Sequence, residues 1–99
     1  MELILLARAE VDVLETQARM EDALAGLGER FNQRVEEALD QLVTFPHSGP
    51  VYAARFRRSI VRDFPFGIFY CIDGRRVVVQ AVIDLRQDSE TIERKLRGA

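Results

Sequence analysis

Nearly all of the positive charge in this chain is carried by arginine. Lys95 is the only lysine, and four arginines crowd one short segment in which Asp63 is the only acid: Arg55, Arg57, Arg58 and Arg62. A guanidinium presents a planar fork of donors that suits bidentate recognition of phosphate or carboxylate, and it suits partner interfaces. Arg55 and Arg57 fit a solvated strand face, whereas Arg58 and Arg62 fit either such a face or contact with a partner.

Few other side chains could take part in acid–base or metal chemistry. His47 is the only histidine, and its Pro/Gly-rich loop favours a turn over a catalyst, because an imidazole base needs an orienting partner. Tyr70 alternates with apolar residues, which favours core packing over proton transfer. Cys71 is the only cysteine, so it forms no internal disulfide and, by itself, no metal site. The sequence predicts neither a metal nor a cofactor.

Length and composition indicate a single domain spanning residues 1–99. The chain has 99 residues, of which 47% are apolar and 30% charged, which is typical of a globular protein that buries a core of its own. The start shows only a very short apolar run, so we expect no signal peptide, no membrane association and a cytoplasmic location. A net charge of −2 argues against broad binding to nucleic acid or anionic membranes.

The arginines and the other polar side chains described above must be positioned by a folded framework. The stretch 64–86 predicts its centre, a β-hairpin in the middle of a sheet. Asp73 and Gly74 tolerate positive φ and lie between two arms, 66–72 and 77–83, rich in β-branched and aromatic residues. On the second arm we expect one face to hold Val77, Val79, Ala81 and Ile83, and the other to hold Val78, Gln80 and Val82. Both faces of both arms are apolar, so the sheet needs cover on both sides.

Two helices are predicted to supply that cover. Over 9–24 the expected apolar stripe consists of Val11, Leu14 and Ala18, extended by Met20 and Leu24. Over 28–45 the periodicity is clearer, with Phe31, Val35, Ala38, Leu39, Leu42 and Phe45, and Pro46 ends the helix. Because only a few residues join them, the helices form an antiparallel hairpin with one apolar face.

The remaining segments complete an α+β fold. Residues 2–6 form a short strand that must join the sheet, 46–50 form a loop, and 55–61 form a strand of poor alternation. In that strand Arg58 shares a face with Phe56 and Ile60, so either the strand is bulged or Arg58 lies at the rim of a concave face. A short last helix begins near Asp88 or Ser89, and we expect it to be peripheral.

Three motifs carry a resemblance to a known family. They are F-P-x-S-G-P after the second helix, R-R-x-x-x-R-x-F-P-F-x-I-F-Y into the hairpin, and V-I-D-L-R-Q-D at the last strand. With this order of elements, essentially the whole chain resembles the RelE/ParE superfamily, the toxins of type II toxin–antitoxin (plasmid stabilisation) systems. The resemblance implies an N-terminal strand, a helical hairpin, a three-stranded antiparallel meander in one twisted sheet, a short C-terminal helix, and an antitoxin that wraps the toxin.

The superfamily divides by activity. RelE-like members are metal-independent endoribonucleases acting in the ribosome, and ParE-like members inhibit DNA gyrase. For a ribonuclease, the resemblance would give Arg58, Arg62 and Arg86 the role of holding the phosphate. Asp84 stands where many ribonuclease members have a histidine, and a carboxylate there would repel phosphate. Arg86 could instead form a structural salt bridge with Asp84 or with nearby acids.

Three hypotheses follow. The chain is a toxin that binds its target, as ParE does, with gyrase as the target; or a ribosome-dependent mRNA endoribonuclease with an altered catalytic set; or a non-toxic, degenerate binding module. In each toxin hypothesis we expect an apolar groove that a segment of the cognate antitoxin fills, and self-association to form a homo-oligomer is the competing use of that surface.

Overall fold

A hairpin of two long strands lies in the middle of a five-stranded sheet, as predicted. The structure is a computed structural model that describes residues 1–98. Its elements are β1 (Glu2–Leu5), α1 (Ala7–Ala23), α2 (Leu27–Thr44), β2 (Val51–Ala53), β3 (Phe56–Ile60), β4 (Phe66–Asp73), β5 (Arg76–Asp84) and α3 (Ser89–Gly98). The strand order is β1-β5-β4-β3-β2, so the hairpin strands β4 and β5 have a neighbour on each side. Gly74 turns the hairpin with φ +60°, which the Asp-Gly pair predicts.

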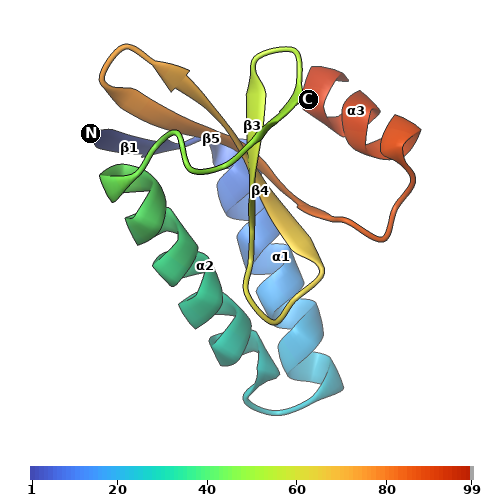
Figure 1. Cartoon of the computed structure of the whole chain (residues 1–99). Helices are drawn as coiled ribbons and strands as arrows, with labels where there is room; N and C mark the ends of the chain where they lie inside the picture. Colours follow the sequence, from blue (N-terminus) through green and yellow to red (C-terminus); the bar gives the residue numbers. More distant parts are fainter. Residues whose placement is uncertain (99) are drawn as a thin grey trace.

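β1 pairs with β5 in parallel, and the other strand pairs are antiparallel. The connection between these parallel neighbours runs through both helices and the other three strands (Figure 1). The fold class predicted from the sequence is therefore confirmed: an N-terminal strand, a helical hairpin, an antiparallel meander and a C-terminal helix.

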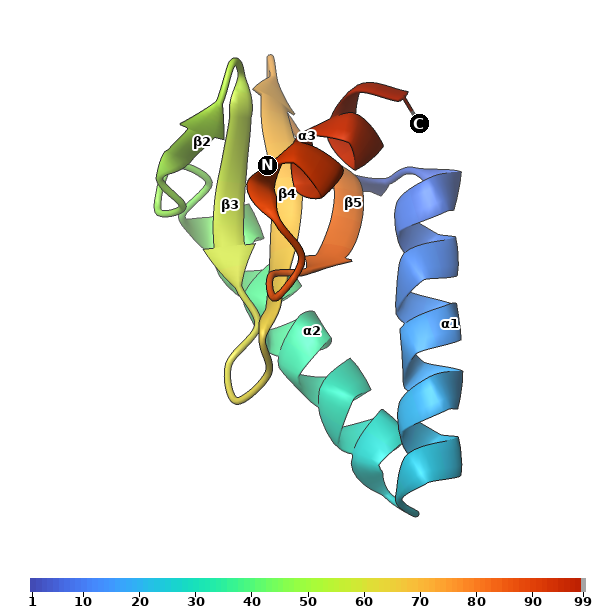
Figure 2. The same ribbon diagram turned by 90° about the vertical axis from the view of Figure 1, so that its right-hand side faces the viewer.

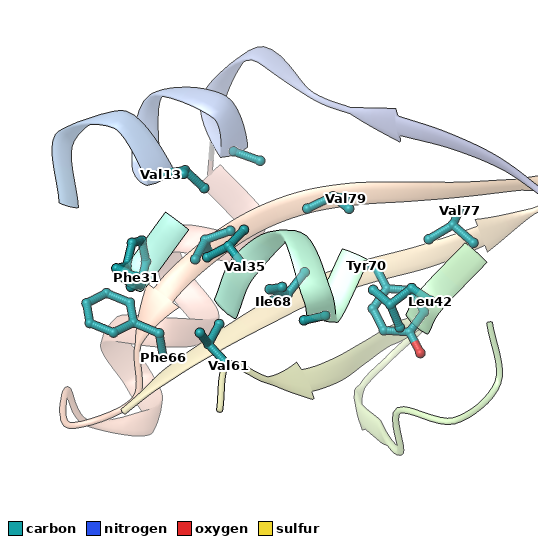
Figure 3. Packing of buried hydrophobic residues seen from close by; sticks show 13 residues of the cluster. Val13, Phe31, Val35, Leu42, Val61, Phe66, Ile68, Tyr70, Val77 and Val79 are labelled. Atoms are coloured by element: carbon teal, nitrogen blue, oxygen red, sulfur yellow. The ribbon is translucent and has the colours of Figure 1, made fainter. Parts of the chain in front are cut away.

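The helical hairpin covers one face of the sheet. Phe31 lies at the centre of this contact, with its ring edge-on to Phe64 at 5.3 Å and to Phe66 at 5.2 Å between centroids. Val35 and Leu42 continue along α2 onto the sheet, and the strands contribute Ile68 and Tyr70 from β4 and Val77 and Val79 from β5 (Figure 3). This face holds the larger of the two hydrophobic clusters in the described residues.

α3 covers part of the opposite face, which the views from two sides make clear (Figures 1 and 2). Ile92 and Leu96, each 4% exposed, pack there against Phe69, Ala81 and Ile83. Asp88 begins the helix, since its Oδ1 accepts the backbone N–H of Thr91 at 2.8 Å. The last helix thus begins where predicted, but it is docked on the sheet rather than peripheral.

A β-bulge changes which sheet face the residues of the second hairpin arm lie on, so the prediction for this arm is partly wrong. Phe69 pairs with Ala81 and Tyr70 with Val79, so Gln80 has no partner on β4. The extra residue reverses the alternation: Val82 joins Val79 on the helical face, and Ala81 and Ile83 turn towards α3. The alternation predicted for Val77 and Val79 is correct, and the prediction for Ala81, Val82 and Ile83 is wrong.

Beyond the end of β1, side chains from α1 form hydrogen bonds with backbone groups on the edge of β5. Arg8 Nε donates to the Gln80 carbonyl at 2.7 Å, and Asp12 Oδ2 accepts the Val82 N–H at 3.0 Å. Arg8 also donates to the Lys95 carbonyl at 2.9 Å and the Leu96 carbonyl at 3.3 Å in the last turn of α3. Arg8 therefore joins three elements and supplies donors to helix carbonyls that lack partners within α3.

Two further sequence predictions are corrected. A three-residue strand, β2, lies within 51–53, between the predicted loop and the predicted strand, and pairs with β3. The predicted apolar stripe of the first helix is not its buried face: α1 buries Ala9, Val13 and Thr16, whereas Val11 and Leu14 are 48% and 58% exposed. The helix carries apolar residues on two sides, and periodicity alone does not say which side faces the sheet.

Candidate functional site

A groove runs between the C-terminal half of α2 and the end of β3. Its volume is about 550 Å³, and we call it the α2–β3 groove. It is lined by Arg34, Glu37, Ala38, Asp40, Gln41, Thr44, Phe45, Ile60 and Arg62. Phe45 and Ile60 are 61% and 52% exposed, so two large apolar side chains face solvent in this groove. Around them lie charges of both signs.

The ends of two elements place these apolar residues in the groove. Phe45 is the residue after the last turn of α2, where its N–H still bonds to the Gln41 carbonyl at 2.7 Å before Pro46 redirects the chain. Ile60 is the last residue of β3 and lies beyond the residues that β2 pairs. Both residues fitted the predicted core pattern, and both predictions are wrong. Phe45 lies beyond the last turn of α2, and Ile60, although it pairs with Gly67 of β4, lies at the end of β3 beyond the residues that β2 pairs.

Several of the groove's charges are already paired. Arg34 Nε donates to Asp63 Oδ2 at 3.0 Å, and its NH1 donates to Glu37 Oε1 at 2.9 Å. The hydrogen bond to Asp63 raises the pKa of the Arg34 guanidinium, so this arginine keeps its charge. Arg62 is 71% exposed, and its nearest carboxylate is Asp63, at 3.9 Å. Arg62 is thus the more available cation in the groove.

Arg58 and Arg86 lie elsewhere, each with its own partner. Arg58 pairs across the strands with Phe69, which contacts α3, and its guanidinium lies over the ring of Tyr52, 5.4 Å from the centroid. Arg86 binds Asp84 through Nε to Oδ1 at 3.0 Å and NH2 to Oδ2 at 2.7 Å. This hydrogen bonding lowers the pKa of the Asp84 carboxyl. Of the three arginines, only Arg62 lines the α2–β3 groove.

The loop of the F-P-x-S-G-P motif has a structural role. Tyr70 is fully buried, and its hydroxyl donates to the Pro46 carbonyl at 2.7 Å and accepts the Gly49 N–H at 3.1 Å. Arg57 NH1 donates to the carbonyls of Gly49, at 2.8 Å, and His47, at 3.2 Å. His47 therefore contributes its backbone to a turn, and the prediction that Tyr70 packs in the core is confirmed.

Sequence reasoning also missed Arg8 and Asp12, which hold the edge of β5. The available signal is their spacing of four residues, which places a cation and an acid on the same side of α1. What they bond could not be predicted, because it depends on the bulge at Gln80.

Two general features bear on the kind of protein this is. Within residues 1–98, no group of three or more histidine, cysteine, aspartate or glutamate side chains is arranged to hold a metal ion. None of the helices described in the structure has the length and apolar character needed to cross a membrane.

Comparison with known proteins places the chain in a family. A family model described as the ParE toxin of type II toxin–antitoxin systems, parDE, matches residues 3–89. A solved structure of the chromosomal ParDE toxin–antitoxin system from P. aeruginosa shares the fold, with a TM-score of 0.76 and 16% identity over 86% of this chain and 96% of that chain. A search of curated protein sequences gives no significant match. Since the family model spans nearly the whole chain, this protein belongs to the ParE toxin family of type II toxin–antitoxin systems.

Proposed function

We propose that this toxin acts in the cytoplasm by binding a protein target, DNA gyrase, and that its cognate antitoxin neutralises it by occupying the α2–β3 groove. The observation that carries the first part is the bidentate pair between Arg86 and Asp84. A guanidinium engaged by a carboxylate is a poor binder of phosphate, because a phosphate must displace that carboxylate and then lies beside its negative charge.

The positions of the other two arginines also favour binding over catalysis. Arg58 lies over Tyr52 on the sheet face that α3 shares, and Arg62 lies in the α2–β3 groove. Phosphate transfer within RNA needs a base, an acid and cations that converge on one phosphorus. The three arginines have three different surroundings and do not converge on one site, which favours binding over phosphate transfer. A catalytic role for them remains a prediction that the assays below test.

The α2–β3 groove suits an antitoxin segment of amphipathic character. Phe45 and Ile60 offer apolar contacts, and Arg62, Asp40 and Glu37 offer polar ones at the rim. The ParDE system from P. aeruginosa, whose structure is similar, is itself a toxin–antitoxin system. Burial of the two exposed apolar side chains would supply the central part of such an interface, with the charges setting its register.

The target is tested by producing the chain alone and measuring growth, followed by two assays on the purified protein. Loss of gyrase supercoiling with intact mRNA supports the proposal. Ribosome-dependent mRNA cleavage that disappears in Arg58→Ala, Arg62→Ala or Arg86→Ala contradicts it and establishes the ribonuclease. Absence of growth arrest and of both activities contradicts it in favour of a non-toxic binding module.

The antitoxin site is tested with the product of the neighbouring reading frame. We expect Phe45→Ser and Ile60→Ser each to weaken binding by about tenfold or more, because each removes a large apolar contact. Val51→Ser is the matched control, since Val51 is 60% exposed on β2 outside the groove. Equal binding by all three variants would place the antitoxin elsewhere.

A further inference from the structure

The outward side of α1 carries a second apolar stripe that the proposed function does not use. Val11, Leu14 and Ala18 are exposed and spaced by three and four residues, so they lie on one side of the helix over about two turns. Val11 is 48% and Leu14 58% exposed. The buried residues of α1 lie on the opposite side, facing the sheet. We call Val11, Leu14 and Ala18 the α1 stripe.

The α1 stripe borders a hollow formed jointly with α2. Leu14 and Ala18 line it together with Gln17, Glu21, Glu29 and Asn32, and its volume is about 720 Å³. The α1 stripe thus lies at the border of an open, mostly polar hollow, and an exposed apolar stripe on a helix can receive the apolar side of another helix.

The surroundings of the α1 stripe are acidic. Residues 7–44, which include both helices, contain nine acidic residues and four arginines. Glu10, Glu15 and Glu29 are exposed beside the stripe or the hollow. The carboxylate of Glu21 also accepts the N–H groups of Gly26, at 2.8 Å, and Gly28, at 3.0 Å, at the start of α2. Among the described residues that line the hollow, none is basic.

This charge distribution indicates which kind of partner can bind the α1 stripe. A second copy of the chain would bring glutamates next to glutamates, and like charges facing each other across an interface oppose association. A helix with lysine or arginine on both sides of an apolar strip would instead meet opposite charge. We propose that the α1 stripe binds a basic amphipathic helix of a partner protein, at a surface separate from the α2–β3 groove.

The test uses the full chain labelled for NMR and a synthetic amphipathic helix of about 18 residues, long enough to form a helix in water. Leucines occupy every third or fourth position of this probe, and lysines flank them. We expect the largest amide shifts within residues 10–21 of α1 and 29–32 of α2, which line the hollow, and saturable binding that weakens as salt rises. Leu14→Glu should weaken the binding roughly tenfold, because it removes the apolar centre of the contact.

Two controls make the result specific. Leu24→Glu introduces the same change at another exposed leucine, 61% exposed at the end of α1 and outside the stripe, and should bind as the original chain does. A probe with glutamate in place of lysine should bind at least about tenfold more weakly. The proposal is overturned if both probes bind alike, if the largest shifts lie outside residues 10–21 and 29–32, or if the chain alone dimerises through a contact that Leu14→Glu abolishes.

Discussion

The hydroxyl of Tyr70 holds the buried Gly49 in place by accepting its N–H at 3.1 Å, and it donates to the Pro46 carbonyl at 2.7 Å. In Figure 3 this side chain lies beside Leu42, with its oxygen directed away from the apolar cluster. One side chain on β4 thus fixes the loop that follows α2. Because Phe45 directly precedes that loop, the same contact helps to position the α2–β3 groove.

Tyr70→Phe tests this arrangement. The substitution keeps the ring but leaves the Gly49 N–H and the Pro46 carbonyl without their partner, so we expect a loss of about 1–3 kcal/mol in the free energy of unfolding. Urea denaturation followed by circular dichroism measures it. Tyr52→Phe is the matched control, because the Tyr52 ring keeps its edge-on contact with Phe69, at 5.1 Å between centroids. Equal losses in both variants would contradict a specific role for the Tyr70 hydroxyl.

Gly49→Ala is expected to destabilise the chain, because the added methyl group would clash with neighbouring atoms. A Cβ at this position would lie 2.6 Å from the Tyr70 hydroxyl and 2.8 Å from the Arg58 carbonyl oxygen, and the second atom is backbone. We expect a smaller loss when Gly49→Ala is made in the Tyr70→Phe background, because one of the two clashes has been removed. A double-mutant cycle by urea denaturation measures this coupling, and strict additivity would contradict it.

The ion pair between Arg86 and Asp84 predicts a pH dependence. Arg86 lowers the folded-state pKa of the Asp84 carboxyl, so its contribution to stability is present above the unfolded-state pKa and is lost as pH falls through the folded-state value. We expect Arg86→Gln to reduce the free energy of unfolding slightly at pH 7 and to match the original chain in strong acid. Urea denaturation at a series of pH values measures it, and a difference that persists in strong acid would contradict the assignment.

Asp12 predicts a change of stability with pH that is opposite in sign to that of Asp84. Burial raises its pKa in the folded state, so the contribution of this carboxyl to stability falls as pH rises from its unfolded-state pKa through its folded-state pKa. Asp12→Asn keeps an acceptor for the Val82 N–H and removes this slope. Asp12→Leu also removes the slope but leaves that N–H unpaired, at a cost of about 1–3 kcal/mol. Urea denaturation from pH 3 to pH 7 separates the two variants, and identical curves would contradict the role of the hydrogen bond.

Arg8→Met is expected to loosen α3. The substitution keeps an unbranched side chain but removes the donors to the Lys95 and Leu96 carbonyls and to the bulge at Gln80. Hydrogen exchange should become faster at the amides of residues 92–96, while the amides of α2 remain protected. Arg19→Met is the matched control on the same helix, because within residues 1–98 the hydrogen bond of Arg19 is local, from NH2 to Thr16 Oγ1 at 3.3 Å. Faster exchange throughout the chain would indicate general destabilisation instead.

Much of this fold could be predicted because its strongest patterns are local. The Asp73-Gly74 turn, the apolar arms beside it, and the spacing from Phe31 to Leu42 each identify an element from neighbouring residues. The bulge could not be predicted, since the sequence does not mark Gln80 as the residue that leaves the pairing with β4. The one extra residue then reversed the faces predicted for Ala81, Val82 and Ile83.

The candidate site was predicted less well, because exposure depends on where an element ends. Val11 and Leu14 on α1, Phe45 after α2 and Ile60 in β3 all fit a core pattern, yet each is about half exposed or more. Large apolar side chains that fit a core pattern are normally buried. Their exposure here marks the two surfaces that we propose for partners, the α2–β3 groove and the α1 stripe.

The parallel pairing of β1 with β5 also sets the order of events during synthesis on the ribosome. Glu2–Leu5 emerge well before their partners, Arg76–Val79, because about 70 residues separate the two strands in the chain. At roughly 5–20 residues per second, the first strand waits for seconds without its neighbour. A nascent chain that stops before residue 76 lacks the strand on which β1, β4 and α3 all pack. The toxin's sheet therefore closes only after α1, α2 and all five strands have been translated.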